Sequence, residues 1–262
     1  METMKHDLGS QVGGSVVWDE YLPMNIPGST RVPVEEICSY FNGVTDGLTG
    51  LDVGSGRGRS AKILKEYLPG SHISALDISF EGLADTEAKT KIQAKAEELP
   101  FKPNSFDFVN VCGVMTNLVD KDPKKALELR VRVVLSLYSI LKSGGCIAIS
   151  DFGADHLFDR YPVNYNRHKL ITQEYGTIAV LKNGDTFIGK SDDEVKALRN
   201  TNQIERYSHH YTIRELIDLL RNAPFEVYKY SVELAQTPKG NKTIDNVIVL
   251  AKKPINHPNP PQ

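Results

Sequence analysis

The most constraining feature of this 262-residue chain is a glycine-rich stretch, residues 51–58, with the sequence LDVGSGRG. Leu51 and Val53 end a short apolar run of the kind found in a buried strand. Glycines at alternate positions then leave no Cβ where the backbone has to turn tightly. The next residues, 59–68, carry apolar side chains at helical spacing. The stretch therefore predicts a strand, a tight turn and a helix start, where a ligand can approach bare N–H groups at the positive helix end.

The next predicted strand ends in an acidic residue, Asp77, 25 residues after Asp52. A carboxylate that closes the second strand, about 20 residues past a glycine turn, is placed to bind both hydroxyls of a ribose. A solvated carboxylate beside a ligand-free turn is the alternative interpretation. The spacing is D-x-G-x-G-x-G, which differs from the G-x-G-x-x-G of the usual dinucleotide fingerprint. This difference disfavours a Rossmann dehydrogenase.

The D-x-G-x-G-x-G pattern with its distant acid resembles the first motif of the class I S-adenosylmethionine-dependent methyltransferases. The resemblance extends over much of the chain, including Phe106-Asp107 and the Leu-Lys-x-Gly-Gly ending at 141–145. It implies an α/β fold of the Rossmann-like, doubly wound kind. The sheet would have seven strands, mostly parallel with an antiparallel last strand, helices on both faces and a lid insertion after the fifth strand. The implied cofactor is S-adenosyl-L-methionine, with S-adenosyl-L-homocysteine as its product and no metal.

The resemblance also assigns a cofactor-binding set. Asp52 and the glycine loop would hold the methionine end, Asp77 the ribose, and Ala96 with Glu97 the adenine side. The full expected set is Asp52, Gly54, Ser55, Gly56, Gly58, Asp77, Ile78, Ala96, Glu97, Cys112, Gly113, Trp18 and Tyr21. Trp18 and Tyr21 lie one helical turn apart and would share a face, although both could instead pack this segment onto the domain. Lys95 is a departure, because many small-molecule methyltransferases carry an acid there that faces the adenine amino group.

The spacing of apolar residues and turn signals predicts the helices and strands of the rest of the chain. Helices are expected at 34–41, 59–68, 80–91, 123–141 and 213–221, with later strands at 92–96, 146–151, 225–232 and 244–251. Asn183-Gly184 between two apolar runs predicts a hairpin over 178–188.

These elements divide the chain into five segments. They are an N-terminal cap (1–45), a cofactor-binding core (46–152), a substrate lid (153–210), a C-terminal helix and strand pair (211–253) and a disordered tail (254–262). A structural or dimerising excursion is the alternative for the lid.

The acceptor side carries weaker signals. Methyl transfer from a sulfonium releases a neutral leaving group, so the protein has to align the reactants and supply a base only if the nucleophile is protonated. Candidate bases are His209, His210 and His156, each of which could equally be structural. His209 and His210 are adjacent, so an extended backbone would point at most one of them into a pocket. Candidate substrate contacts are Asn117, Arg206 and Tyr211.

Composition limits the classes of partner and compartment. The net charge is −2 and the pI is about 6.4, which argues against strong non-specific binding to nucleic acid. Three scattered cysteines fit free thiols in a reducing compartment better than a disulfide framework. No apolar run approaches the length of a membrane span and no signal peptide is recognised, so we expect a cytoplasmic protein.

The function that follows is methyl transfer from S-adenosylmethionine to an oxygen or nitrogen atom of a small-molecule acceptor. Two alternatives stay open. A methyltransferase acting on a modified tRNA base is one, because residues 29–31 and 206–211 faintly resemble such enzymes, and a basic face across the lid would favour it. A non-catalytic cofactor-binding protein is the other. A homodimer is compatible with the sequence.

Overall fold

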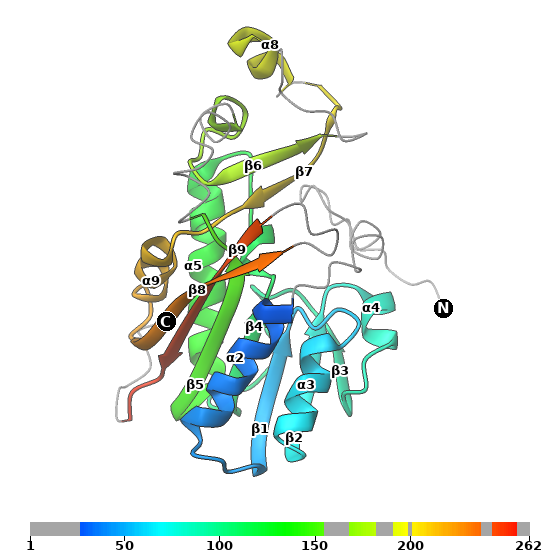
Figure 1. Ribbon diagram of the computed structural model, residues 1–262, viewed down its shortest axis with the longest axis vertical. Coiled ribbons are helices and arrows are strands. Elements are labelled where there is room, and N and C mark those ends of the chain that lie inside the picture. The colour runs from blue at the N-terminus through cyan, green and yellow to red at the C-terminus, as the bar shows by residue number, and fades with distance from the viewer. Residues whose placement is uncertain (1–26, 155–167, 182–190, 199–200, 237–242, 256–262) are drawn as a thin grey trace.

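The computed structural model describes residues 27–154, 168–181, 191–198, 201–236 and 243–255. At its centre lies a seven-stranded sheet in the order β3-β2-β1-β4-β5-β9-β8 (Figure 1). The strands from β3 to β5 run parallel to one another, and β9 runs antiparallel to both of its neighbours. The predicted fold class is therefore confirmed.

The elements have the following bounds. The sheet consists of β1 (Asp46–Val53), β2 (Gly70–Asp77), β3 (Thr90–Gln93), β4 (Phe106–Cys112), β5 (Leu141–Phe152), β8 (Glu226–Gln236) and β9 (Thr243–Lys252). The helices beside it are α2 (Pro27–Tyr40), α3 (Arg59–Tyr67), α4 (Phe80–Ala84), α5 (Pro123–Ile140), α9 (Ile213–Leu220) and the 3-10 turn η1 (Met115–Asn117). A second sheet pairs β6 (Thr177–Leu181) with β7 (Ile204–His209), and α8 (Asp192–Ala197) lies between them in sequence.

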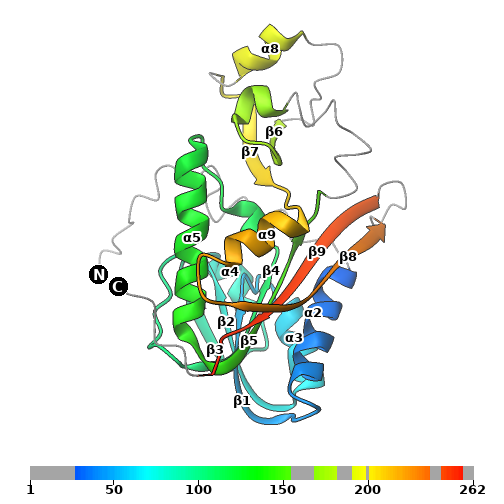
Figure 2. The same ribbon diagram turned by 90° about the vertical axis from the view of Figure 1, so that its left-hand side faces the viewer.

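Helices cover both faces of the large sheet (Figure 2). Successive strand residues point to opposite faces, so in β4 Val109 and Val111 join the core beneath α5 and α9, whereas Phe108 joins the core beneath α2 and α3. Burial on both faces explains why these strands appear in the sequence as nearly continuous apolar runs. The arrangement places the carboxyl ends of β1, β2, β4 and β5 at one edge, with the β6–β7 sheet beyond it (Figure 1).

Capping residues mark the starts of α5 and α9. Asp122 Oδ1 accepts a hydrogen bond from the Lys124 N–H at 2.9 Å, and Pro123 occupies the first helical position of α5. Thr212 Oγ1 accepts from the Glu215 N–H at 3.1 Å and begins α9. Both starts agree with the sequence-based prediction.

Several predicted boundaries were wrong, among them those of the strand expected at 92–96, which is β3 at Thr90–Gln93. Helix α2 begins at Pro27 rather than at residue 34. Pro27 takes the first helical position, which suits proline, whereas Pro33 lies inside the helix and supplies no N–H to its backbone ladder. Helix α4 ends at Ala84 instead of 91, since Lys91 to Gln93 pair with β2 as strand β3. Strand β5 starts at Leu141, before the glycines that were expected to separate it from α5.

The segment predicted as a lid is partly described. Strand β6 matches the first half of the predicted hairpin, but its described partner is β7, with Thr177 opposite His209. The Asn183-Gly184 turn and the second half of that hairpin lie outside the described residues. No helix in the described part of the chain is long and apolar enough to cross a membrane.

Candidate cofactor and acceptor site

The glycine turn lies where β1 meets β2. The N–H groups of Gly54 and Ser55 both donate to the carbonyl oxygen of Leu76, at 2.8 and 3.1 Å. Gly54, Gly56 and Gly58 have φ values of 71°, 49° and 80°, which are left-handed conformations that favour glycine. The turn therefore needs its glycines for backbone geometry, as the sequence predicted.

Two of these glycines also lie against neighbouring side chains. A Cβ on Gly58 would lie 2.2 Å from Thr86 Oγ1 and 2.7 Å from the Thr86 Cα. A Cβ on Gly54 would lie 2.1 Å from Cγ2 of Val114, a residue in the loop that leaves β4. The turn is thus packed directly on the segments that follow α4 and β4.

Gly58→Ala is expected to destabilise the protein by more than strain alone. The left-handed backbone costs an alanine about 1–2 kcal/mol, and forced overpacking against Thr86 adds about 1–3 kcal/mol. Gly43→Ala is a matched control, because Gly43 has a φ of 76° but no atom within 4 Å of its Cβ position. Urea unfolding of both variants measures the difference, and equal losses of stability would contradict the packing seen at Gly58.

Asp77 braces the turn from the end of β2. Its Oδ2 accepts from the Gly56 N–H and its Oδ1 from the Ser79 N–H, both at 2.8 Å. A carboxylate has about four acceptor positions, so these two backbone donors do not saturate it. The sequence predicted the location of this residue but not its contacts to the turn.

Asp52 is enclosed beneath the turn. Its Oδ1 accepts from Asn110 Nδ2 at 2.8 Å and its Oδ2 from Ser60 Oγ at 3.0 Å, and the side chain has no exposure. Burial raises the pKa of Asp52 to about 6, even though these hydrogen bonds favour the carboxylate. In this structure the residue therefore holds β1, β4 and α3 together, and its predicted contact with the methionine end stays a prediction.

Asp52→Asn is expected to change how stability depends on pH. The folded protein holds this proton to a higher pH than the unfolded chain does, so its stability falls as the pH rises from 3.8 to about 6. A rise of that size corresponds to about 3 kcal/mol. Urea unfolding across this pH range should show the variant gaining stability relative to the wild type. A difference that does not change with pH would contradict the buried carboxyl.

The exit from β4 lies beside the glycine turn. Gly113 is exposed, has a φ of 68° and donates its N–H to the Ser150 carbonyl at 2.9 Å. Asn117 Nδ2 donates to the Gly113 carbonyl at 2.8 Å, so this predicted substrate residue fixes the backbone next to the site. Cys112 Sγ lies 3.9 Å from Thr30 Oγ1, and burial raises the pKa of its thiol to about 12.

The remaining predicted cofactor residues are placed unevenly. Ala96 packs into the core on the α5 side, while Lys95 and Glu97 are half-buried in the turn after β3. The Ile78 carbonyl accepts from Gln93 Nε2 at 3.0 Å. Trp18, Tyr21 and His156 lie outside the described residues.

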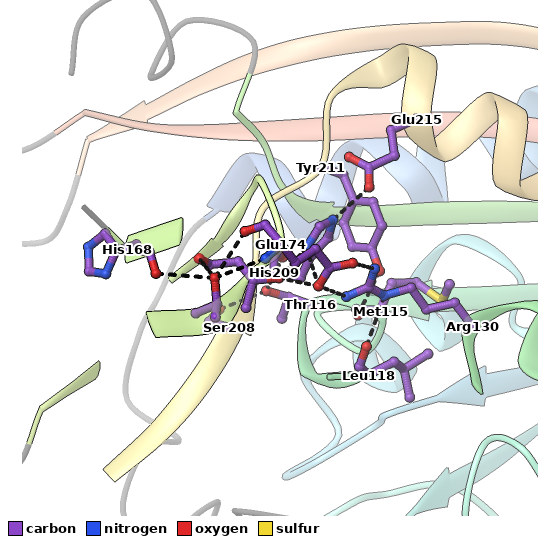
Figure 3. Close-up of polar contacts among 12 residues, drawn as sticks. Met115, Thr116, Leu118, Arg130, His168, Glu174, Ser208, His209, Tyr211 and Glu215 are labelled. Carbon is purple, nitrogen blue, oxygen red and sulfur yellow. Dashed lines mark hydrogen bonds and ion pairs between the residues drawn. The ribbon is translucent and has the colours of Figure 1, made fainter. Parts of the chain in front are cut away.

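A second polar cluster joins the β6–β7 sheet to the core (Figure 3). The guanidinium of Arg130, on α5, makes a bidentate pair with Glu174 at 2.6 and 3.1 Å. Its Nε donates to the Leu118 carbonyl at 2.9 Å, and its side chain is only 2% exposed. Burial opposes ionisation of Glu174, but hydrogen bonds from His209 and Arg130 still lower its pKa to about 2. We call Arg130, Glu174, His209 and Glu215 the junction cluster.

His209 belongs to the junction cluster. Its Nδ1 lies 2.7 Å from Thr177 Oγ1, and its Nε2 lies 2.8 Å from Glu215 Oε1. Burial disfavours its charge, but hydrogen bonds to Glu174 and Glu215 prevail and raise its pKa. The side chain is fully buried and both ring nitrogens have partners, so in this structure His209 links β7 to α9 through Glu215, and its predicted role as a general base stays a prediction.

The other predicted acceptor residues differ in their surroundings. His210 is half-buried and packs against Phe152 with ring centroids 5.6 Å apart. Burial and the nearby His209, His168 and Arg206 lower its pKa to about 3, which makes it a weak base. Tyr211, predicted to contact substrate, is instead fully buried, and its hydroxyl donates to the Met115 carbonyl at 3.0 Å. Arg206 is half-buried on β7 opposite Val180.

The described residues contain no group of three or more His, Cys, Asp or Glu side chains arranged to hold a metal ion. What the site offers is a left-handed glycine turn, an acidic residue beside it and open space next to the exposed Gly113. No sequence pattern indicated the junction cluster, apart from the expectation that His209 and His210 point to opposite sides.

The glycine turn and the strands around it match a known family. Residues 51–149, from the end of β1 to β5, match the family model described as "Methyltransferase domain". This part of the chain is therefore similar to a methyltransferase domain, in agreement with the resemblance of its glycine motif to the class I S-adenosylmethionine-dependent family. The "Ubiquinone/menaquinone biosynthesis C-methyltransferase UbiE" of Vibrio cholerae is 31% identical over 122 residues, which are 42% of this chain and 44% of that protein. Proteins of the same name from Psychromonas ingrahamii and Haemophilus ducreyi align over 21% and 31% of their lengths, so the chain spans less than half of these relatives.

Solved structures of methyltransferases have the same fold as this chain. A SAM-dependent methyltransferase from Methanosarcina mazei superimposes with a TM-score of 0.64 at 24% identity, covering 82% of this chain and 97% of that one. The 1,6-didemethyltoxoflavin-N1-methyltransferase of Burkholderia thailandensis, solved with S-adenosylhomocysteine, gives 0.55 at 16% identity and covers 90% and 81% of the two chains. At such identities the similarity establishes the fold alone.

Proposed function

We propose that this protein binds S-adenosylmethionine at the carboxyl ends of β1, β2 and β4 and transfers its methyl group to an oxygen or nitrogen atom of a small molecule. The observation that carries the proposal is the left-handed glycine turn braced by Asp77, which lies within the part of the chain that matches the methyltransferase family. S-adenosylhomocysteine is the expected product and no metal takes part. The protein acts in the cytoplasm on a small-molecule acceptor.

The chain's contribution is mainly positioning. The sulfonium loses its charge as the methyl group leaves, so no acid is required, and alignment of donor and acceptor supplies much of the rate. Of the three candidate histidines, His209 has both nitrogens engaged and His210 has a pKa of about 3. Neither of these two histidines, the candidates that the structure describes, is suited to act as a base. We therefore expect an acceptor atom whose lone pair is available near neutral pH, as in a neutral amine or an acidic hydroxyl.

A carbon acceptor is the second candidate, and the relatives favour it. The aligned proteins from Vibrio cholerae and Psychromonas ingrahamii are named C-methyltransferases. An electron-rich aromatic carbon beside an ionised hydroxyl needs no strong protein base for the attack, so it also suits the described residues. The two candidate functions differ in the atom of the acceptor that receives the methyl group, which is oxygen or nitrogen in the first and carbon in the second.

The test is turnover with S-adenosylmethionine carrying a 13C-labelled methyl group. The probes are aniline for nitrogen, 4-nitrophenol for oxygen, resorcinol for carbon and unfractionated tRNA for the nucleic-acid alternative. We expect release of S-adenosylhomocysteine with one small-molecule class, and the 13C chemical shift identifies the acceptor atom. Asp77→Ala is the reference with weakened cofactor binding, and Asp46→Ala, at the opposite end of β1, is the matched control. Cofactor binding without methylation of any probe would support a non-catalytic protein, and labelled tRNA would support the alternative substrate.

A further inference from the structure

The loop after β4, Val114–Leu118, contacts the glycine turn on one side. Val114 fills the space beside Gly54, since its Cγ2 would lie 2.1 Å from a Cβ at that position. Asn117 Nδ2 holds the Gly113 carbonyl at 2.8 Å, immediately before the loop. A change in the conformation of the turn therefore reaches this loop through direct packing.

The same loop contacts the β6–β7 sheet on its other side (Figure 3). Thr116 Oγ1 donates to the His209 carbonyl at 2.7 Å and lies 2.9 Å from Ser208 Oγ. Among the described residues, both hydrogen bonds that join η1 to β7 use this hydroxyl. The Thr116 side chain is 2% exposed, so neither bond is exchanged for one to water.

Neighbouring elements fix the loop in position. Asp151 Oδ2 accepts from the Thr116 N–H at 3.1 Å, Tyr211 donates to the Met115 carbonyl at 3.0 Å, and Arg130 donates to the Leu118 carbonyl at 2.9 Å. Arg130 also binds Glu174, which precedes β6. The same buried contacts therefore set both the position of the β6–β7 sheet and the conformation of the loop.

We propose that Thr116 is a positioning residue that couples ligand occupancy of the glycine turn to docking of the β6–β7 sheet on the core. The ligand, S-adenosylmethionine or its product, is the one given by the proposed function, on which this inference rests. A ligand bound at the turn stabilises one conformation of the loop Val114–Leu118. Through its hydrogen bonds to β7, the Thr116 hydroxyl then stabilises docking of the β6–β7 sheet on the core. Because coupling between two sites is reciprocal, a docked sheet also strengthens cofactor binding.

The experiment measures amide hydrogen exchange of the full chain with and without S-adenosylhomocysteine, together with calorimetric affinity for the same probe. Thr116→Val removes the hydroxyl at nearly constant volume, and Thr116→Ser retains it. Thr201→Val is the matched control, because Thr201 donates its hydroxyl to the Leu198 carbonyl at 2.8 Å within the same insertion but away from η1. Unfolding midpoints of all four proteins confirm that the variants are folded.

In the wild type, we expect the probe to slow exchange in β6 and β7 as well as at the glycine turn. In Thr116→Val, the probe should no longer slow amide exchange in β6 and β7. Its affinity should be about three- to tenfold weaker, as expected for loss of a buried hydrogen bond. Thr116→Ser and Thr201→Val should behave like the wild type. Binding that leaves β6 and β7 unchanged in the wild type would overturn the coupling while leaving the proposed function intact. Absence of calorimetric binding to the wild type would overturn both.

Discussion

Arg130→Met is expected to lower the free energy of unfolding by about 3–5 kcal/mol, because it leaves a buried carboxylate without its partner cation. Arg130 and Glu174 are 2% and 16% exposed, and their closest approach is 2.6 Å. Water cannot replace the lost contact at such burial, and the Leu118 carbonyl loses its donor as well. Urea unfolding at pH 7 measures the change.

A surface pair provides the control for Arg130→Met. Arg221 also approaches a carboxylate, Asp218, at 2.6 Å, but the two side chains are 69% and 51% exposed. Arg221→Met should therefore cost less than about 1 kcal/mol. Replacing Arg130 and Glu174 together by methionine should recover much of the loss, because no unpaired charge remains. Equal costs for the two single substitutions would contradict the buried junction cluster.

Asp77→Ala is expected to weaken binding of S-adenosylhomocysteine by roughly 10- to 100-fold. The substitution removes the acceptor for the Gly56 and Ser79 N–H groups and the predicted contacts to the ribose hydroxyls. One hydrogen bond to a charged group contributes about 1.5–3 kcal/mol. Every 1.4 kcal/mol is about tenfold in affinity, so the expected loss corresponds to one such bond. Calorimetric titration measures the loss.

Asp46→Ala should leave that affinity unchanged, because Asp46 lies at the opposite end of β1 from the turn. Unfolding midpoints separate a loss of binding from a loss of structure. Unaltered affinity in Asp77→Ala would remove this carboxylate from the cofactor site. A similar loss in Asp46→Ala would indicate that the effect is general destabilisation.

Much of the fold was predictable because its local signals agree with one another. The apolar run ending at Val53, the glycines after it and the face of α3 all indicate one βα unit, and Asp122-Pro123 and Thr212 mark helix starts by their chemistry. Boundaries failed where long-range pairing decided the outcome. Lys91 lies in a strand because it pairs with Ala75 of β2, which no local pattern indicates.

The candidate site divides in the same way. The glycine turn and Asp77 follow from spacing, because both come from neighbouring strand ends. The junction cluster does not, because Arg130 and Glu174 are 44 residues apart in the chain, and nothing near Arg130 distinguishes it from the exposed charges of α5. The role of Asn110 was not predicted, because this residue lies in an otherwise apolar strand. Its amide donates a hydrogen bond to the buried Asp52.

The most direct test of the central claim is calorimetric titration of the wild-type protein with S-adenosylmethionine and S-adenosylhomocysteine, with NAD as the comparison ligand. We predict affinities in the micromolar range for both sulfur compounds, corresponding to about −8 kcal/mol, and no binding of NAD. Tight binding of NAD, or no heat with either sulfur compound, would contradict the assignment of the glycine turn to this cofactor.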